Sequence, residues 1–169
     1  MKKILILFLI AFASVTSAQK VIKFKRASGH SFHIWGNDFE GVIFKENFEP
    51  FKSDSLGRVG FTPSPADVEF TEQLLRQKID TAKCSIYITG DTVGKNLKYY
   101  VRQYFGYFNE KGEKIIFIDC FYRFSDVYPE KKYWLKHRVF VWDGGAAIWN
   151  VKLNLSTGQM FDLYINGIG

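Results

Sequence analysis

The sequence is poor in the residues that build cross-linked or metal-bound small proteins. Its 169 residues include 2 cysteines and 3 histidines, and only 4 are prolines. Two thiols are too few for a disulfide-built scaffold, and nothing in the composition indicates collagen, a coiled coil or low complexity. Hydrophobic residues make up 47% of the chain, which argues against disorder because disordered chains lack the apolar surface that offsets chain entropy. The length predicts one packed domain.

Motifs that specify catalysis or metal binding are also lacking. The sequence contains no His-Glu-X-X-His, Gly-X-Ser-X-Gly or Walker-type loop, and no Cys-X-X-Cys pair. His30 and His33 are three residues apart with Asp38 and Glu40 nearby, but nothing in this pattern sets the geometry of a metal site. We therefore predict no catalytic residue, no metal and no cofactor.

The only long apolar run lies at the N-terminus. Two lysines precede the ten apolar residues 4–13, and Thr16-Ser17-Ala18 supplies the small residues that signal peptidase reads. Ten helical residues span about 15 Å, half of the ~30 Å hydrocarbon core, so the run is too short for an anchor. We predict a bacterial signal peptide over residues 1–18 and a mature chain, without a membrane span, that is periplasmic or secreted.

The charge of the mature chain is modest. Without residues 1–18 the chain has 21 Lys+Arg against 17 Asp+Glu, a formal charge of +4. Export and this small excess argue against nucleic acid as a partner, because nucleic-acid binding relies on concentrated positive charge. A polyanionic component of the envelope or an acidic protein fits the charge better.

Ser64-Pro65-Ala66-Asp67 is the clearest local signal in the chain. A serine at the N-cap accepts a backbone N–H of the first turn, proline fits the first helical position, and an early acid opposes the positive end of the helix dipole. Apolar residues then recur at helical spacing, with Arg76 and Lys78 late in the segment. The pattern predicts a helix from Pro65 to about Asp80.

The residues after about 84 predict antiparallel strands. Aromatic and β-branched runs alternate with turn signals; these runs cover 97–108, 114–123, 138–142, 146–153 and 159–165. The first run carries aromatic residues on both faces, so either both faces are covered or one aromatic face is a contact surface.

Residues 19–63 contain dense turn signals and short strand-like pieces. We read them as an N-terminal arm of short strands and loops that packs on a domain formed by residues 64–169. The predicted fold class is α+β, with one main helix packed on a curved antiparallel β-meander of four to five strands.

Five pieces of sequence carry a resemblance. They are Phe61-Thr62-Pro63-Ser64-Pro65, Tyr104-Phe105-Gly106-Tyr107, Gly112-Glu113-Lys114-Ile115, Trp142-Asp143-Gly144-Gly145 and Ile165-Asn166-Gly167. Over about 61–169 the chain resembles small exported bacterial proteins of unknown function, and its helix-then-meander order is similar to the cystatin and nuclear-transport-factor type of α+β fold. The resemblance implies a curved sheet around a helix, a fold that serves inhibitors, binding modules and enzymes. The cystatin inhibitory loop Gln-X-Val-X-Gly is not present in the sequence, which speaks against protease inhibition by that route.

One segment concentrates basic and aromatic residues. Its candidate binding residues are Lys131, Lys132, Tyr133, Trp134, Lys136 and Arg138. Such a mixture can hold anionic groups and stack on rings. The alternative is a solvated connection between strands in which Trp134 turns inward.

Two further features leave alternatives open. Cys84 and Cys120 are the only thiols, and export permits a disulfide between them, although two separate small buried residues would give the same pattern. Asp119 interrupts an apolar strand. It is either a buried carboxylate with a raised pKa or a side chain that points to solvent.

Aromatic strands without a convergent set of acids, bases or nucleophiles favour a non-enzymatic function. We predict an exported binding or protein-interaction module of the bacterial envelope that holds an unknown protein or envelope ligand, through the concave face of the sheet or through residues 131–138. The alternatives are a small enzyme whose pocket in the curved sheet gathers Asp119, Tyr122 and Arg102, and a periplasmic inhibitor or immunity protein.

Overall fold

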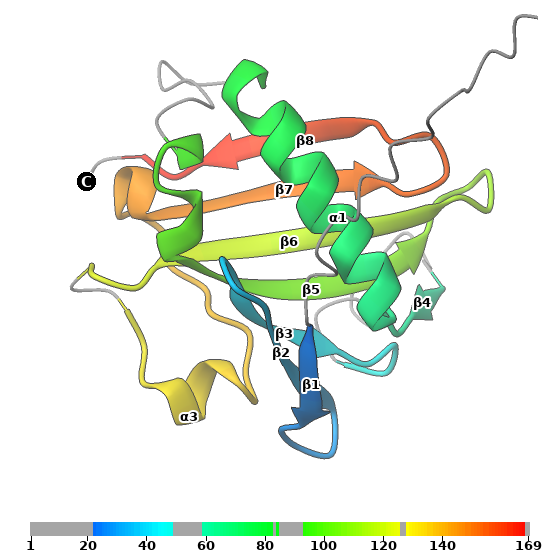
Figure 1. The fold of residues 1–169 in the computed structure, drawn as a ribbon, viewed down its shortest axis with the longest axis horizontal. Coiled ribbons are helices and arrows are strands. Elements are labelled where there is room, and N and C mark those ends of the chain that lie inside the picture. Colours follow the sequence, from blue (N-terminus) through cyan, green and yellow to red (C-terminus); the bar gives the residue numbers. More distant parts are fainter. Residues whose placement is uncertain (1–21, 49–58, 83, 85–92, 126–127, 168–169) are drawn as a thin grey trace, which may run out of the picture.

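A computed structural model describes residues 22–48, 59–82, 84, 93–125 and 128–167. The predicted signal peptide, residues 1–18, lies outside them. The strands form one eight-stranded mixed sheet in the order β1-β2-β3-β5-β6-β7-β8, with β4 beside β5 (Figure 1). The strands are β1 (Lys23–Arg26), β2 (Ser31–Trp35), β3 (Glu40–Phe44), β4 (Gly60–Phe61), β5 (Tyr100–Phe108), β6 (Lys114–Tyr122), β7 (Ile148–Asn154) and β8 (Met160–Ile165).

The helix α1 (Pro65–Lys78) begins where the sequence predicts. Ser64 Oγ accepts a hydrogen bond from the backbone N–H of Asp67 at 3.1 Å, and the Asp67 carboxylate accepts one from the backbone N–H of Ser64 at 2.9 Å. This capping box pairs two donors that the first turn leaves without partners. The helix ends in a short 3₁₀ turn, η2 (Ile79–Thr81).

The predicted meander of four to five strands around one main helix is wrong. β3 pairs in parallel with β5, from Glu40 beside Val101 to Ile43 beside Tyr104. β4 pairs with the far end of the same edge of β5. β1 to β3 therefore continue the sheet, which is larger than predicted and mixed. Local signals reveal hairpins, but a parallel pair joined by a crossover through α1 leaves no local mark.

The strand predicted over residues 138–142 is also wrong. β6 and β7 pair directly with each other, and residues 138–142 lie outside the sheet in a segment that we call the strap, residues 128–142. The strap contains one helical turn, α3 (Lys131–Trp134). Short 3₁₀ turns precede β5 and β7; they are η3 (Leu97–Tyr99) and η4 (Gly145–Ala147).

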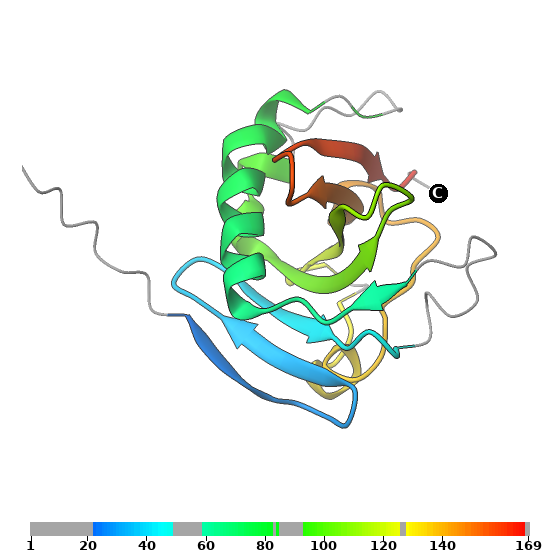
Figure 2. The same ribbon diagram turned by 90° about the vertical axis from the view of Figure 1, so that its right-hand side faces the viewer.

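Both faces of the sheet are covered. Figure 2 shows α1 along one face, with the yellow and orange strap on the other side of the curled sheet. Side chains alternate along β5, so Tyr100 and Tyr104 enter the core under α1, whereas Val101 and Phe105 enter a second core under the strap. The first eight residues of β5 are buried, so its aromatic residues pack inward on both faces.

Among the described residues, no helix has the length and apolar character needed to cross a bilayer. α1, the longest helix among the described residues, has 14 residues.

Candidate functional site

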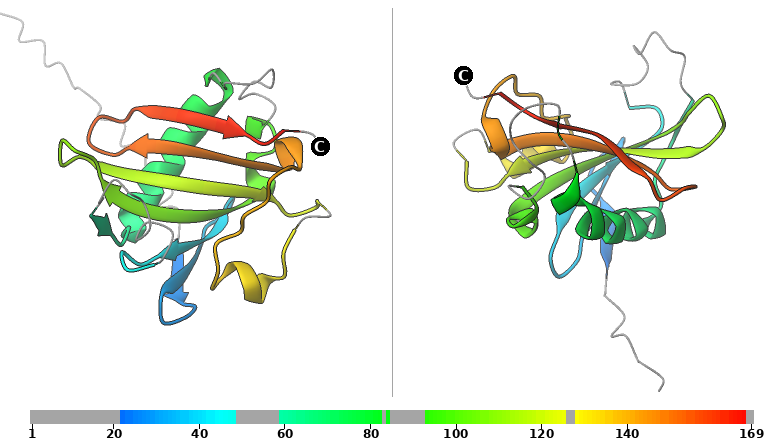
Figure 3. Two further views of the ribbon diagram at one scale, coloured as in Figure 1. Left: turned by 180° about the vertical axis from the view of Figure 1, so that it is seen from behind. Right: turned by 90° about the horizontal axis from the view of Figure 1, so that it is seen from above.

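The predicted binding segment, residues 131–138, lies in the strap over the face of the sheet opposite α1 (Figure 3). Trp134 is fully buried there and packs edge-on against Phe121, with 6.0 Å between ring centroids. Its indole Nε1 donates a hydrogen bond to the Tyr128 hydroxyl at 3.1 Å. Trp134 thus turns inward and anchors the strap to the second core.

The other candidate residues divide into two groups. Lys131 forms an ion pair with Glu40, and Arg138 forms one with Asp119 at 2.6 Å from Nε to Oδ2. Lys132, Tyr133 and Lys136 are exposed. The structure therefore does not gather the six predicted residues into one surface, because three of them already hold the strap in place.

Gln103 on β5 fixes the middle of the strap. Its amide Nε2 donates hydrogen bonds to the carbonyls of Trp134 at 2.9 Å and His137 at 2.8 Å, and its Oε1 accepts one from the backbone N–H of Val139 at 2.7 Å. Ser31 Oγ adds a hydrogen bond to the Leu135 carbonyl. The backbone of the strap does not pair with a strand, so its N–H and C=O groups need these side-chain partners.

Asp119 faces the strap and has only 9% of its surface exposed. Burial raises the pKa of its carboxyl above the ordinary value, and the positive charge of Arg138 works in the opposite direction. Of the two predictions for Asp119, a buried carboxylate or a side chain that points to solvent, the structure shows the buried carboxylate. The side chain is engaged by Arg138 Nε and Nη2 in a two-pronged contact.

The trio predicted for an enzymatic pocket is not assembled. Arg102 and Tyr122 point to the α1 side of the sheet, whereas Asp119 lies on the strap side, since neighbouring residues of a strand face opposite ways. Cys84 and Cys120 are free thiols in the structure, with Cys120 buried in the core under α1 and Cys84 packed against that core.

Among the histidines, His33 has the clearest role. Its ring stacks on Trp35 with 4.4 Å between centroids, and its Nε2 lies 3.0 Å from Glu40 Oε1. The hydrogen bond from His33 is the main cause that lowers the pKa of Glu40 to about 2; burial opposes this shift, and Lys131 adds to it. Within the described part of the chain, no three His, Cys, Asp or Glu side chains are grouped as a metal site.

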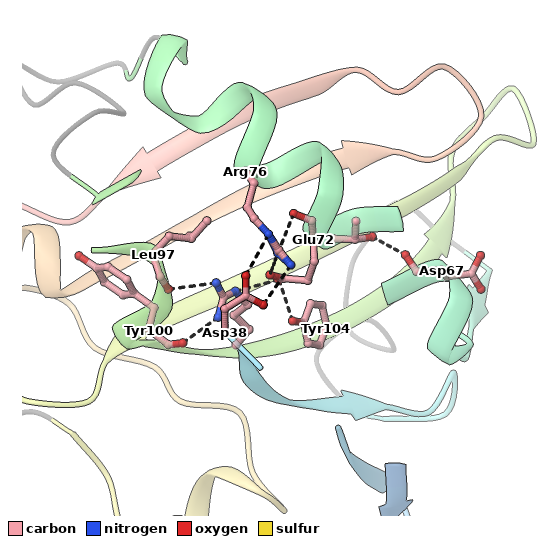
Figure 4. Close-up of polar contacts among 9 residues, drawn as sticks. Asp38, Asp67, Glu72, Arg76, Leu97, Tyr100 and Tyr104 are labelled. Atoms are coloured by element: carbon pink, nitrogen blue, oxygen red, sulfur yellow. Dashed lines mark hydrogen bonds and ion pairs between the residues drawn. The ribbon is translucent and has the colours of Figure 1, made fainter. Parts of the chain in front are cut away.

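A buried charge network lies between α1 and β5 (Figure 4). Glu72 of α1 is 1% exposed and Arg102 of β5 is fully buried, and Arg102 Nε lies 2.8 Å from Glu72 Oε1. The Tyr104 hydroxyl donates a hydrogen bond to the same oxygen at 2.9 Å. Arg102 also donates to the carbonyls of Leu97 and Tyr100.

The two charges of this network depend on each other. Burial is the largest single influence and would lower the pKa of Arg102, but the negative charge of Glu72, together with smaller contributions from other groups, raises it overall. Burial also raises the pKa of Tyr104 well above its ordinary value, with the Glu72 charge adding to the effect. At neutral pH Arg102 is therefore charged and Tyr104 protonated.

Arg76 connects the network to the surface. Its Nη1 lies 3.5 Å from Glu72 Oε2, and its Nε lies 3.3 Å from Asp38 Oδ2 (Figure 4). Asp38 belongs to the turn between β2 and β3, so this pair ties that turn to α1.

Beside Asp38 opens a cavity of about 480 Å³ that we call the end cleft. Its lining comes from the β2–β3 turn, from η3 and from the end of β6: Trp35, Gly36, Asn37, Asp38, Phe39, Glu40, Lys98, Tyr99, Arg123 and Phe124. A second cavity of about 270 Å³ shares Asp38 and Lys98 with the end cleft and reaches Arg102. The volume of the end cleft falls within the range of about 300 to 1,000 Å³ typical of small-molecule sites.

Two acids, Asp38 and Glu40, and two basic residues, Lys98 and Arg123, line the end cleft. Its two acids are engaged by the protein itself: Arg76 pairs with Asp38, and Lys131 pairs with Glu40, which also contacts His33. Lys98 forms no ion pair with any described residue. The Arg123 side chain is 32% exposed, and its Nη2 lies 3.4 Å from Oε2 of Glu40. Glu40 is therefore shared between Arg123 and Lys131.

Aromatic rings flank these cations. Tyr99 and Phe124 pack edge to face with 5.6 Å between centroids, and Phe124 has 69% of its surface exposed. The Lys98 ammonium lies 4.8 Å from the centre of the Tyr99 ring. Trp35 also lines the cavity, and its ring stacks on His33.

Sequence reasoning missed the end cleft. The turn signal around Gly36 and the acids Asp38 and Glu40 marked one wall of it, but Lys98 and Arg123 are distant in sequence and sit in no motif. Only the parallel pairing of β3 with β5 brings these segments together. The chain matches no protein-family model, no curated protein and no solved structure.

Proposed function

We propose that this protein is a non-enzymatic binding module of the bacterial envelope, exported by a cleaved signal peptide, whose end cleft holds an anionic ligand with a ring-shaped group. The observation that carries the proposal is that Lys98, which forms no ion pair with any described residue, lines the same cavity of about 480 Å³ as Arg123. A polyanionic saccharide of the envelope combines both ligand features.

The charge pattern supports an anion over a cation. The carboxylates that line the cleft, Asp38 and Glu40, are both neutralised by basic side chains of the protein. A cationic ligand would have to compete with these ion pairs. A ligand carboxylate or phosphate would instead gain charge-assisted hydrogen bonds from Lys98 and Arg123, which are about twice as strong as neutral ones.

The aromatic walls support a ring-shaped ligand. Trp35, Tyr99 and Phe124 line the same cavity as the two cations, and Phe124 is the most exposed of the three. Exposed aromatic residues that border a cavity offer apolar contact to a ligand ring, and the large exposed fraction of Phe124 leaves that contact open.

The same ion pairs favour binding over catalysis. A general acid or base must exchange protons near neutral pH. The pKa of Glu40 is lowered to about 2, so this carboxylate stays ionised at neutral pH, and it is held by His33 and Lys131.

The test is calorimetric titration of the mature chain, residues 19–169, with a hexamer of galacturonic acid and with a neutral maltohexaose of equal length. We expect the acidic hexamer to bind more tightly and to weaken as salt rises, because salt screens charges beyond about 8–10 Å. Lys98→Gln should weaken binding about fivefold, which corresponds to about 1 kcal/mol.

Matched controls separate the cleft from general charge. Lys132→Gln removes one exposed lysine on the strap and should leave the affinity unchanged, whereas Phe124→Ala should weaken it severalfold. Equal affinity for the two hexamers, or equal loss in the Lys98 and Lys132 variants, would overturn the proposal.

A further inference from the structure

A separate cavity lies on the strap side of the sheet and shares no lining residue with the end cleft. This outer pocket, of about 140 Å³, opens between the end of the strap and β6, β7 and β8. Three large aromatic side chains line it and are strongly exposed: Trp142 at 83%, Phe140 at 61% and Tyr164 at 44%. Phe140 and Trp142 pack edge to face with 4.8 Å between centroids.

The floor of the outer pocket is polar. Asp119, Asn150 and Tyr164 stand side by side on neighbouring strands, in one row across β6, β7 and β8. Arg138 reaches in from the strap to pair with Asp119. Among the described residues the Asn150 side-chain amide has no hydrogen-bond partner.

The polar floor and the exposed rings of Phe140 and Trp142 at the mouth of the pocket, which we call the rim, together restrict the kind of ligand. Asp119 accepts hydrogen bonds, Arg138 donates them and Asn150 does both, and the ion pair leaves the floor without net charge. The rim offers flat ring surface. A ligand that matches both parts has hydroxyl groups along its edge and an apolar C–H face, which is the chemistry of an uncharged sugar ring.

We infer that the outer pocket is a saccharide-binding site that takes one neutral sugar ring, stacked on Trp142, with its hydroxyls directed to Asp119, Arg138 and Asn150. This inference goes beyond the end cleft and stands without it. A free anion is disfavoured because the Asp119 carboxylate lies in the floor. A proline-rich peptide has carbonyl acceptors but few N–H donors, so it would leave the acceptor oxygens of Asp119 and Asn150 without new hydrogen bonds.

Core packing does not explain the exposed side chains of Phe140 and Trp142. The neighbours Val139 and Val141 of the same stretch are buried or partly buried. Large aromatic side chains grouped at the mouth of a polar pocket are typical of a contact surface.

The experiment is titration of the mature chain with glucose, galactose, mannose and N-acetylglucosamine and their β-linked disaccharides, followed by two-dimensional NMR and by protection of tryptophan fluorescence from acrylamide. We expect at least one of these sugars to bind in the millimolar range and to protect Trp142. Trp142→Ala should weaken that binding at least tenfold, and Asn150→Ala severalfold. Both positions are at least partly exposed, so these variants test contact rather than folding.

Two comparisons make the outcome decisive. Phe70→Ala removes an exposed aromatic residue of α1 that lines neither cavity, and it should leave sugar binding unchanged. Phe124→Ala should affect the acidic hexamer and not the neutral sugar, so a failure of one site is distinguishable from a failure of the other. Binding of none of the sugars, equal binding by the Trp142→Ala variant, or binding of a polyproline peptide in place of sugar would overturn the inference.

Discussion

Glu72→Gln tests how much the fold depends on the buried network. The substitution keeps the shape of the side chain and removes its charge, so the fully buried guanidinium of Arg102 loses the carboxylate 2.8 Å away. Breaking a buried ion pair from one side costs about 3–5 kcal/mol, because an uncompensated charge is left in the interior. Arg102 keeps its hydrogen bonds to Leu97 and Tyr100, which places the expected loss toward the lower end.

The loss is measurable against the whole stability of the domain. Domains of this kind unfold with about 5–15 kcal/mol, so the variant should lose a large share of it. At about 2–4 °C for each kcal/mol in a chain of this size, a loss of about 3 kcal/mol should lower the melting temperature by roughly 6–12 °C. Urea unfolding followed by tryptophan fluorescence gives the free energy from the midpoint and slope.

A control variant and a double-mutant cycle separate the loss of the ion pair from other effects of the substitution. Glu69→Gln changes the same residue type one turn earlier on α1, where the structure gives the side chain no ion pair with a described residue, and should stay within about 0.5 kcal/mol. Arg102→Met alone should also be costly, but combined with Glu72→Gln the losses should fall short of their sum by at least about 2 kcal/mol, because the double variant buries no unpaired charge. A Glu72→Gln loss below about 1 kcal/mol, or strict additivity, would refute the argument.

Two further predictions concern the strap and its ion pairs. The pKa of Glu40 falls from 4.5 to about 2 on folding, so this carboxylate contributes stability that is complete above pH 4.5 and lost as the pH falls toward 2; Glu40→Gln should be less stable than the natural protein by about 1–3 kcal/mol at pH 7, and urea titrations across pH should show the difference vanish near pH 2. Trp134→Ala removes a fully buried ring and should cost about 3–5 kcal/mol, and hydrogen exchange of the Val139 amide, bonded to Gln103, should quicken if Trp134 anchors the strap and stay slow if it does not.

Those parts of the fold that depend on neighbouring residues were predictable. The cap formed by Ser64 and Asp67 and the start of α1 followed from residue types within one helical turn. The pairing of β5 with β6 followed from two aromatic runs and a short polar turn. In each case the interaction that decides the structure joins residues close in sequence.

The parts set by distant residues were not predictable. Short strands were predicted within residues 19–63, but not that they continue the main sheet. That position depends on the parallel pairing of β3 with β5, which nothing in the local sequence indicates. The end cleft depends on the same pairing. The buried network likewise joins Glu72 to Arg102, thirty residues apart, and nothing around either residue announces its partner.

In the strap, the alternating pattern indicates which side chains are buried and which are exposed, but not whether the backbone pairs with another strand. In residues 138–142 the alternate positions Val139 and Val141 face inward, whereas Phe140 and Trp142 face solvent, so the alternation itself is real. The backbone, however, bonds to side chains: Val139 N–H donates to Gln103, and the Val141 carbonyl accepts from Asn166. A strand in the sheet would have paired with a neighbouring backbone along its length. Because side chains hold this stretch away from the sheet, its outward residues stand at the mouth of the outer pocket, and a single segment both closes the second core and supplies the aromatic rim on which we expect a sugar to stack.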